Sequence, residues 1–202
     1  MGAGAGGVSG CITGAPPLGA LPLETARFRL RPLKAHDDGL YIALYTNAEV
    51  MRHVGDALTL PAARSAFDKV LAFTQRTDGG YQAWVVVDRS TGEEWGLLAL
   101  VAREGGSEIG ALIWPQYHNA GVATEIIRRL MDFAFSEGGV DTVFTRHRTV
   151  NGGAEGLMRK LDFRRIPAEG SKGGEVRWER TRRRWQRAGG MQTRAPKTAP
   201  SE

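Results

Sequence analysis

One stretch near the middle of the chain, residues 107–130, constrains the fold most strongly. It begins with a largely apolar run that reaches Trp114, and Pro115 ends this run because proline has no N–H to give to a β ladder. After a short polar loop, Gly121 begins a segment whose apolar residues recur at helical spacing through 126–134. The sequence therefore predicts a strand, a short loop and a helix, in that order.

The start of this predicted helix is suited to binding an anion. The first turn of a helix has free N–H groups, and the helix dipole places partial positive charge there. Ala120, Gly121 and Ala123 are small, so the backbone can approach a ligand closely. We therefore expect an anion site in this loop, and an ordinary strand–helix connection is the alternative interpretation.

Length and composition indicate a single globular domain. The chain has 202 residues, of which 42% are hydrophobic and 24% charged, enough for one domain with a sizeable core. The single cysteine, Cys11, excludes an internal disulfide framework and favours a reducing compartment. No apolar run approaches the roughly 20 residues of a membrane span. We expect a cytoplasmic protein with no membrane partner.

The two ends of the chain differ in composition from its middle. Residues 1–22 are rich in Gly, Ala and Pro and contain no Lys or Arg, so they lack the positively charged start of a signal peptide. Residues 188–202 have a similar composition, with a Gly pair and two prolines. We therefore expect a flexible leader at 1–22, a domain at 23–187 and a flexible tail at 188–202.

Strand and helix signals alternate along the predicted domain. Strands are expected at 27–33, 81–88, 95–101, 107–114, 141–148, 163–166 and 176–181, and helices at 36–46, 61–77, 121–137 and 151–160. Such an order is typical of an α/β domain that is not doubly wound. We expect a mixed, mostly antiparallel central sheet of about six to seven strands, flanked by helices.

The loop at 118–123 resembles the acyl-CoA loop of the GNAT superfamily of N-acetyltransferases. That pattern is Gln or Arg, two residues, Gly, one residue, and then Gly or Ala. The segment His118-Asn-Ala-Gly-Val-Ala123 is similar: Gly121 and Ala123 match, and His118 stands where Gln or Arg is usual. Residues 23–33, Leu-Glu-Thr-Ala-Arg-Phe-Arg-Leu-Arg-Pro-Leu, resemble the opening of the ribosomal-protein-acetyltransferase-like (Rim-type) branch of this superfamily.

A third segment, from Asn151 to Phe163, resembles the end of a GNAT domain, and the predicted order of elements is also the one expected of that fold. Three positions depart from the family pattern. Ala154 replaces the usual Ser, Asp162 replaces the usual Gly, and Met158 stands where many members carry a Tyr that serves as general acid. The missing Tyr and Ser put side-chain acid catalysis in doubt.

The resemblance implies an N-acetyltransferase that moves an acetyl group from acetyl-CoA to a primary amine by direct attack in a ternary complex. A backbone N–H near the end of the central strand would meet the negative charge that develops on the carbonyl oxygen, and holding the two reactants together would supply much of the rate. The residues implied in cofactor binding are Ile113, Trp114, His118, Asn119, Ala120, Gly121, Val122, Ala123, Thr124 and Asn151. No metal is expected, since no His/Cys cluster has ligand spacing.

Two side chains are candidates for taking the proton that the acceptor ammonium must lose. Glu108 falls in the central strand, and His147 falls in the next strand and has a useful pKa range. The alternatives are a solvated strand end for Glu108 and a structural histidine for His147. Asn151 by itself also fits a plain helix N-cap. Positioning of the reactants, with water taking the proton, is the alternative to both candidate bases.

The formal net charge is +5, and arginines crowd the segment 177–187 together with Trp178 and Trp185. A phosphate-rich or RNA partner is one interpretation, and an exposed edge strand protected by charge is the other. We expect no nucleic-acid partner. The expected acceptor is a protein N-terminus, including a ribosomal one, or a small-molecule amine, and the expected assembly is a monomer or homodimer. The alternatives are a non-catalytic or weakly active acyl-CoA-binding domain and a transferase that uses another acyl-CoA.

Overall fold

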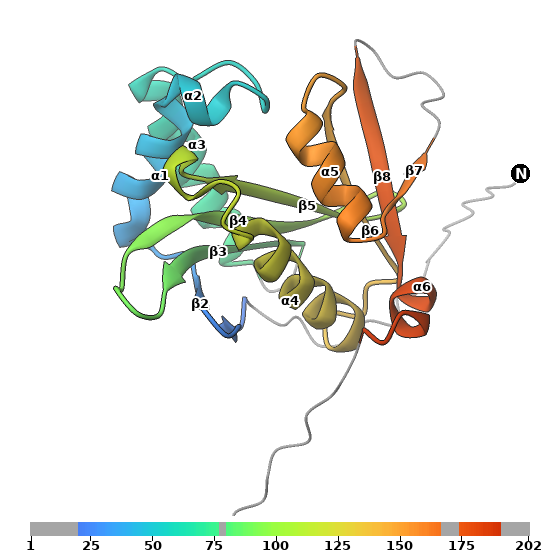
Figure 1. Ribbon diagram of the computed structural model, residues 1–202. Helices are drawn as coiled ribbons and strands as arrows, with labels where there is room; N and C mark the ends of the chain where they lie inside the picture. Colours follow the sequence, from blue (N-terminus) through green and yellow to red (C-terminus); the bar gives the residue numbers. More distant parts are fainter. Residues whose placement is uncertain (1–19, 77–79, 167–173, 191–202) are drawn as a thin grey trace, which may run out of the picture.

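An eight-stranded sheet with the strand order β1-β2-β3-β4-β5-β6-β8-β7 forms the centre of the structure (Figure 1). The computed structural model describes residues 20–76, 80–166 and 174–190. The strands are β1 (Leu23–Glu24), β2 (Phe28–Pro32), β3 (Tyr81–Asp88), β4 (Glu94–Arg103), β5 (Gly106–Ile113), β6 (Thr142–Arg148), β7 (Arg164–Ile166) and β8 (Glu175–Thr181). The helices are η1 (Ala35–Asp37), α1 (Asp38–Thr46), α2 (Ala48–Met51), α3 (Leu60–Thr74), η2 (Pro115–Tyr117), α4 (Val122–Ser136), α5 (Gly152–Lys160) and α6 (Arg182–Arg187).

The predicted fold class and element order are confirmed, and the sheet has one strand more than the upper expected number. The additional strand is β1, whose two residues are too few to show a period in the sequence. The short helices α2 and α6 were not expected either, because four and six residues complete little more than one turn. All pairings in the sheet are antiparallel except that between β5 and β6.

Each face of the sheet carries its own hydrophobic core. On one face, apolar side chains of β2 to β6 and β8 pack against α4, α5 and Trp185 of α6. On the other face, Ala83, Val85, Leu97 and Leu112 pack against α1, α2 and α3. Figure 1 shows α1, α2 and α3 grouped at one end of the sheet, whereas α5 lies beside β6 and β8.

The sheet is continuous in order but weakly joined between β5 and β6. β5 pairs with β4 along its whole length, from Gly106 to Ile113. With β6 it makes only two parallel pairs, Ser107 with Val143 and Glu108 with Phe144. The two strands therefore diverge beyond Glu108, and Figure 1 shows β5 and β6 running apart in this region.

Both predicted flexible ends reach into the described residues, and there they contact the domain. The carbonyl oxygen of Leu21 accepts a hydrogen bond from Nε1 of Trp84 at 2.7 Å. At the other end, the N–H of Gly190 donates to the carbonyl of Trp185 at 3.1 Å. The rest of the predicted leader and tail, residues 1–19 and 191–202, lies outside the described residues.

The interpretation of the C-terminal arginines as a charged edge strand is wrong. β8 lies between β6 and β7, so it is an interior strand of the sheet. Trp178 and Trp185 are buried, and so is Arg180, whose guanidinium pairs with Asp162. Much of this arginine-rich segment is therefore part of the packed domain.

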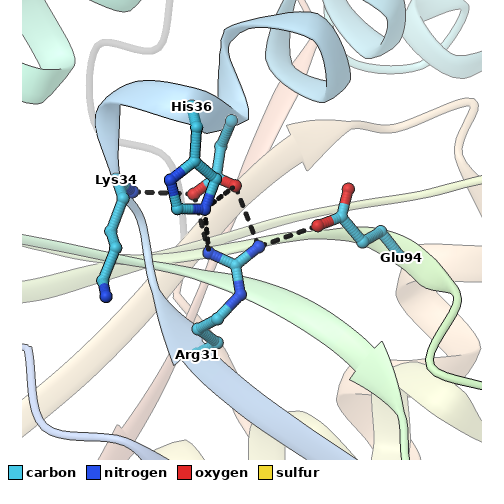
Figure 2. Close-up of polar contacts among 5 residues, drawn as sticks. Arg31, Lys34, His36 and Glu94 are labelled. Carbon is cyan, nitrogen blue, oxygen red and sulfur yellow. Dashed lines mark hydrogen bonds and ion pairs between the residues drawn. The ribbon is translucent and has the colours of Figure 1, made fainter.

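A buried carboxylate ties β2 to the helices that follow it (Figure 2). Asp37 is only 2% exposed, and its oxygens accept hydrogen bonds from both terminal nitrogens of Arg31, at 2.8 and 2.9 Å. The backbone N–H of Lys34 also donates to Asp37, at 2.7 Å. Arg31 extends this cluster to Glu94 of β4 at 2.7 Å. The cluster thereby sets where η1 and α1 leave the sheet.

We predict that Asp37→Ala lowers the free energy of unfolding by about 3 kcal/mol, because the change removes the anchor of a charge pair that is largely shielded from water. Glu94→Ala is the matched control, since Glu94 is a more exposed partner of the same arginine, and it should cost at most about 1 kcal/mol. Urea unfolding of the two variants measures both values. Equal losses of unfolding free energy in the two variants would show that the burial of Asp37 does not make its ion pair more stabilising than the exposed one.

Candidate functional site

The divergence of β5 and β6 leads into a cavity of about 590 Å³. Its walls are residues 108–112 of β5, residues 145–148 of β6, and one face of α5. Tyr45 and His53 close the cavity from the side of α1 and α2. A second hollow, of about 450 Å³, lies at the opposite end of β5 between two Gly-Gly turns, and Asp141 is the one charged residue among those described that line it. Titratable side chains therefore gather in the first cavity.

Peptide groups of β5 are directed into this cavity. The N–H of Trp114 donates to the carbonyl of Trp95 at 3.0 Å. Because residues of antiparallel neighbours alternate between bonded and non-bonded pairs, the even-numbered residues of β5 bond to β4 and the odd-numbered ones face β6. Past the two pairs with β6, the N–H groups of Ala111 and Ile113 therefore face the gap. Of the two cofactor-binding residues expected at the end of the central strand, Ile113 has an N–H that remains available, whereas the N–H of Trp114 is already bonded.

The loop after β5 is held in place by its own side chains. Nε2 of His118 lies 2.9 Å from the carbonyl oxygen of Ile113. The ring of Tyr117 stacks on Trp95, with centroids 3.9 Å apart and planes at 4°. Asn119 takes a left-handed conformation with φ of 61°, which Asn tolerates better than most residues. His118 thus turns back toward the end of β5, and its ring braces the loop.

The N-terminus of α4 has no side-chain cap. Its N-cap residue is Gly121, with φ of 76°, a conformation that favours glycine. By contrast, a side chain caps each of α2, α3, α5 and α6: those of Asn47, Thr59, Asn151 and Thr181. The first helical bond that α4 makes joins the N–H of Glu125 to the carbonyl of Gly121. The N–H groups of 122–124 therefore have no partner inside the helix.

Glu108 lines the cavity but is held by two arginines. Arg146 donates two hydrogen bonds to it, at 2.9 and 3.0 Å, and Arg103 donates one at 3.4 Å. Burial acts to raise the pKa of Glu108, but the hydrogen bonds and positive charges of Arg146 and Arg103 outweigh it and lower the pKa below its usual value. Glu108 is therefore an anion throughout the neutral range.

His147 also lines the cavity, and it is 8% exposed. Its Nδ1 lies 2.8 Å from the carbonyl oxygen of Arg148, to which it must donate a proton. Nε2 is buried and has no hydrogen-bond partner among the described residues. In the neutral ring this nitrogen is an acceptor, so His147 carries an unused base in the cavity wall.

The two candidate bases lie on opposite faces of the sheet. Glu108 shares the face of Arg146, its ion-pair partner, and successive strand residues alternate between faces. His147 therefore shares the other face with Val143, which packs in the core beneath α4. Both reach the cavity because the gap between β5 and β6 joins the two faces.

Helix α5 contributes two residues that depart from the family pattern, Ala154 and Met158, to the cavity wall. Asn151 caps this helix, since its Oδ1 accepts from the N–H of Ala154 at 3.0 Å. Asn151, Ala154 and Met158 all line the cavity, and Met158 is 4% exposed. The helix-cap interpretation of Asn151 is confirmed, and its position in the cavity wall leaves its amide near any bound ligand.

Several residues of the cavity were not predicted from the sequence. Arg146 and Arg148 come from β6, and Tyr45 and Tyr81 come from α1 and β3. Burial raises the pKa of Tyr81 to about 12, so its hydroxyl stays protonated at neutral pH. No local motif marks these residues. For the arginines, the available signal was strand alternation, which places every second residue of 142–148 on the face of Glu108.

No helix in residues 20–76, 80–166 and 174–190 is long and apolar enough to cross a membrane. In the same ranges, no group of three or more His, Cys, Asp or Glu side chains is arranged to hold a metal ion.

Solved structures share this fold. The spermidine N-acetyltransferase from Vibrio cholerae in complex with CoA and spermine superposes with a TM-score of 0.66 at 18% identity, covering 80% of this chain and 99% of that one. The ribosomal α-N-protein acetyltransferase RimL in complex with coenzyme A has a TM-score of 0.67 at 15% identity, covering 80% and 98%. The two are about equally similar to this chain, so the structural comparison selects no branch.

Sequence comparison gives the family. The N-acetyltransferase YoaA of Bacillus subtilis (strain 168) is 28% identical over 148 residues, which are 71% of this chain and 82% of the relative. Residues 27–164, more than half of the chain, match the family described as "Acetyltransferase (GNAT) domain". The chain therefore belongs to the GNAT acetyltransferase family.

Proposed function

We propose that this protein is an acetyl-CoA-dependent N-acetyltransferase of the cytoplasm that acetylates a primary amine by direct attack in a ternary complex. The observation that carries the proposal is the unfinished pairing of β5. Ala111 and Ile113 offer N–H groups to a gap beside a 590 Å³ cavity, and the nearby start of α4 offers further N–H groups with no cap. An extended amide-containing arm and a diphosphate are ligands that fit these two sets of donors.

These donors suggest how acetyl-CoA would be held. The pantetheine arm would bond to the odd-numbered residues of β5 in the way that a neighbouring strand does. The pyrophosphate would accept hydrogen bonds from the first turn of α4, where the helix dipole also favours an anion. Asn151, at the start of α5, is placed to bond the arm from the opposite wall. The cavity wall reaches α4 at Ile127.

Bound acetyl-CoA would supply a thioester carbonyl for the amine to attack. As the amine nitrogen bonds to the carbonyl carbon, negative charge moves onto the oxygen. The donor we assign to this oxygen is the N–H of Ala111, which lines the cavity, and the N–H of Ile113 is left to the arm. The leaving thiolate needs little help near neutral pH, since a thiol pKa is only about 8.5. The buried Met158 cannot donate a proton, and on this argument no side-chain acid is required.

We propose that His147 takes the proton that the acceptor ammonium must lose. Its Nε2 is an acceptor without a partner among the described residues, and it belongs to a residue of the cavity wall. Glu108 is too weak a base in its arginine pair, because its pKa is lowered. Its fixed negative charge is better suited to attracting the ammonium form of the acceptor to the cavity.

We further propose that the acceptor is a single amine, such as a peptide N-terminus, and that polyamines are disfavoured. Among the described residues, the two acids in the cavity wall are each matched by an arginine: Glu108 pairs with Arg146, and Glu175 of β8 lies opposite Arg148 of β6. A polycation would therefore find no surplus of negative charge in this wall. The opening at 23–33 supports a Rim-type, protein-directed assignment, which stays a proposal.

A second candidate function has its own observation. Ala154 and Met158 leave α5 without the hydroxyl side chains that many relatives use. A domain that binds an acyl-CoA without turnover, or one that uses a different acyl group, would fit that wall as well. Thiol release from acetyl-CoA and from succinyl-CoA, measured with a panel of amines and peptides, separates the three functions.

The first prediction tests whether the loop and helix start at 118–124 bind the diphosphate, and it uses the variant Gly121→Asp. Aspartate tolerates φ of 76° better than most residues and is a good helix cap, so the variant should fold. Its charge would repel a diphosphate, and we expect the Kd of CoA to rise at least about ten-fold. Gly189→Asp is the matched control, because Gly189 also has φ of 77° and follows α6, whose Trp185 contacts Asp132 in the C-terminal half of α4. Unchanged affinity by calorimetry in a folded Gly121→Asp variant would contradict the assignment.

A second prediction separates the two titratable candidates by their pH dependence. The kcat of the protein should rise with pH along a single limb, and His147→Gln should lower kcat and remove that limb. Glu108→Gln should raise the KM of the acceptor and leave the midpoint of the limb in place, because the lowered pKa keeps Glu108 ionised across the measured range. If both variants keep the wild-type profile, solvent takes the proton.

The third prediction concerns the charge of the acceptor. We expect a higher kcat/KM for a peptide whose N-terminal amine is its only basic group than for spermidine, measured by thiol release. Arg148→Glu should narrow this difference by about ten-fold, since it exchanges a repulsive charge for an attractive one. Arg183→Glu, an exposed change on α6, is the control for net charge alone. Spermidine as the better wild-type acceptor would overturn the proposed acceptor class.

A further inference from the structure

Arg27, just before β2, contacts the loop that precedes α4 and the start of that helix, across a separation of more than 90 residues. Its Nη1 donates to the carbonyl oxygen of Ala120 at 3.0 Å. Its Nε donates to Glu125 at 2.7 Å, and its backbone N–H donates to the other oxygen of the same carboxylate at 2.9 Å. Nη2 lies 3.5 Å from the position that a Cβ would occupy on Gly121. One residue thus contacts the loop just before α4 and the first turn of that helix.

These contacts matter because a carboxylate, that of Glu125, lies close to the N–H groups that we propose bind the diphosphate. Glu125 lies in the first turn of α4, where its charge stabilises the helix. Burial acts to raise the pKa of Glu125, but hydrogen bonds from Thr25 and Arg27 and the charge of Arg27 lower it, so the side chain is an anion. An unpaired carboxylate beside the uncapped N–H groups would repel a diphosphate. Arg27 places a positive charge between them.

We propose that Arg27 is a positioning residue for the diphosphate of the acyl donor. It fixes the carbonyl of Ala120 away from the anion, which leaves the N–H groups of 122–124 pointing outward, and it neutralises Glu125 at the same point. This inference rests on the proposed function of the loop. It adds a residue from the N-terminal strand that makes no contact with the reacting atoms.

The ion pair itself is half-exposed, with the Arg27 side chain 46% and the Glu125 side chain 23% exposed. Such a pair contributes little to the stability of a fold. A large effect of Arg27 on ligand affinity, with a small effect on stability, is therefore the signature of positioning.

The test compares two ligands that differ in the diphosphate. The Kd of CoA is measured by calorimetry. Pantetheine lacks the nucleotide and the diphosphate, so its Kd is measured from NMR chemical-shift changes, which can follow binding in the millimolar range. We expect Arg27→Gln to raise the Kd of CoA about ten-fold and to leave the Kd of pantetheine unchanged. Arg29→Gln is the matched control, since Arg29 lies on β2 and pairs with the exposed Glu24.

A second pair of variants tests the electrostatic part. Adding Glu125→Gln to Arg27→Gln removes the carboxylate that the first change left unpaired, so the double variant should bind CoA more tightly than Arg27→Gln alone. Arg27→Lys keeps the charge but lacks the separate nitrogens with which the guanidinium reaches Ala120 and Glu125, so its CoA affinity should fall between wild type and Arg27→Gln. This variant also serves if Arg27→Gln does not fold.

The outcomes are distinguishable. Wild-type affinity for CoA in a folded Arg27→Gln variant would overturn the inference and leave the proposed function intact. Equal weakening of CoA and pantetheine would also overturn it, since the role would then be structural. No binding of CoA by the wild-type protein would overturn the proposed function and this inference with it.

Discussion

The structure depends on a pairing between β5 and β6 that stops after two residue pairs. Each strand is otherwise well supported: β5 pairs with β4 along its length, and β6 pairs with β8 from Thr142 to Arg148. The two halves of the sheet can therefore diverge without losing their own ladders. The N–H groups that the divergence leaves unpaired are strong donors whose burial without a partner is costly. A ligand that supplies acceptors along this line completes the sheet.

Charge in this protein is arranged in local pairs that tie distant segments together. Arg31 holds the buried Asp37, Arg103 and Arg146 hold Glu108, and Arg180 and Arg184 hold Asp162. Arg31 also reaches Glu94 of β4, and Arg146 and Arg180 each join elements that are not neighbours in sequence. Several of the arginines that give the chain its excess of positive charge are therefore used inside the fold. A composition that suggested a nucleic-acid surface is explained in part by internal pairing.

The two candidate proton-handling groups illustrate how environment assigns roles. Glu108 and His147 stand on adjacent strands, yet alternation places them on opposite faces of the sheet. Glu108 is fixed as an anion by its arginines, whereas His147 donates at Nδ1 and keeps Nε2 as an acceptor. Charge and acid–base capacity are thus separated in space. Both side chains nevertheless line the same cavity.

The sequence by itself determined the elements that rest on local rules. Alternation and helical spacing located the long strands and helices, Pro115 ended the central strand, and Gly121 marked the start of α4, because backbone preferences and side-chain periodicity act over a few residues. The resemblance of residues 118–123 to an acyl-CoA loop rests on the same kind of local pattern.

Only the tertiary structure decided which distant groups meet. The pairing of Arg27 with Glu125, the hold of Arg146 on Glu108, and the interior position of β8 depend on sheet order, which no local pattern records. The opposite faces of Glu108 and His147 depend on register, since a shift of one residue turns a side chain to the other face. Register and order are settled by packing two cores at once, which is a property of the whole chain.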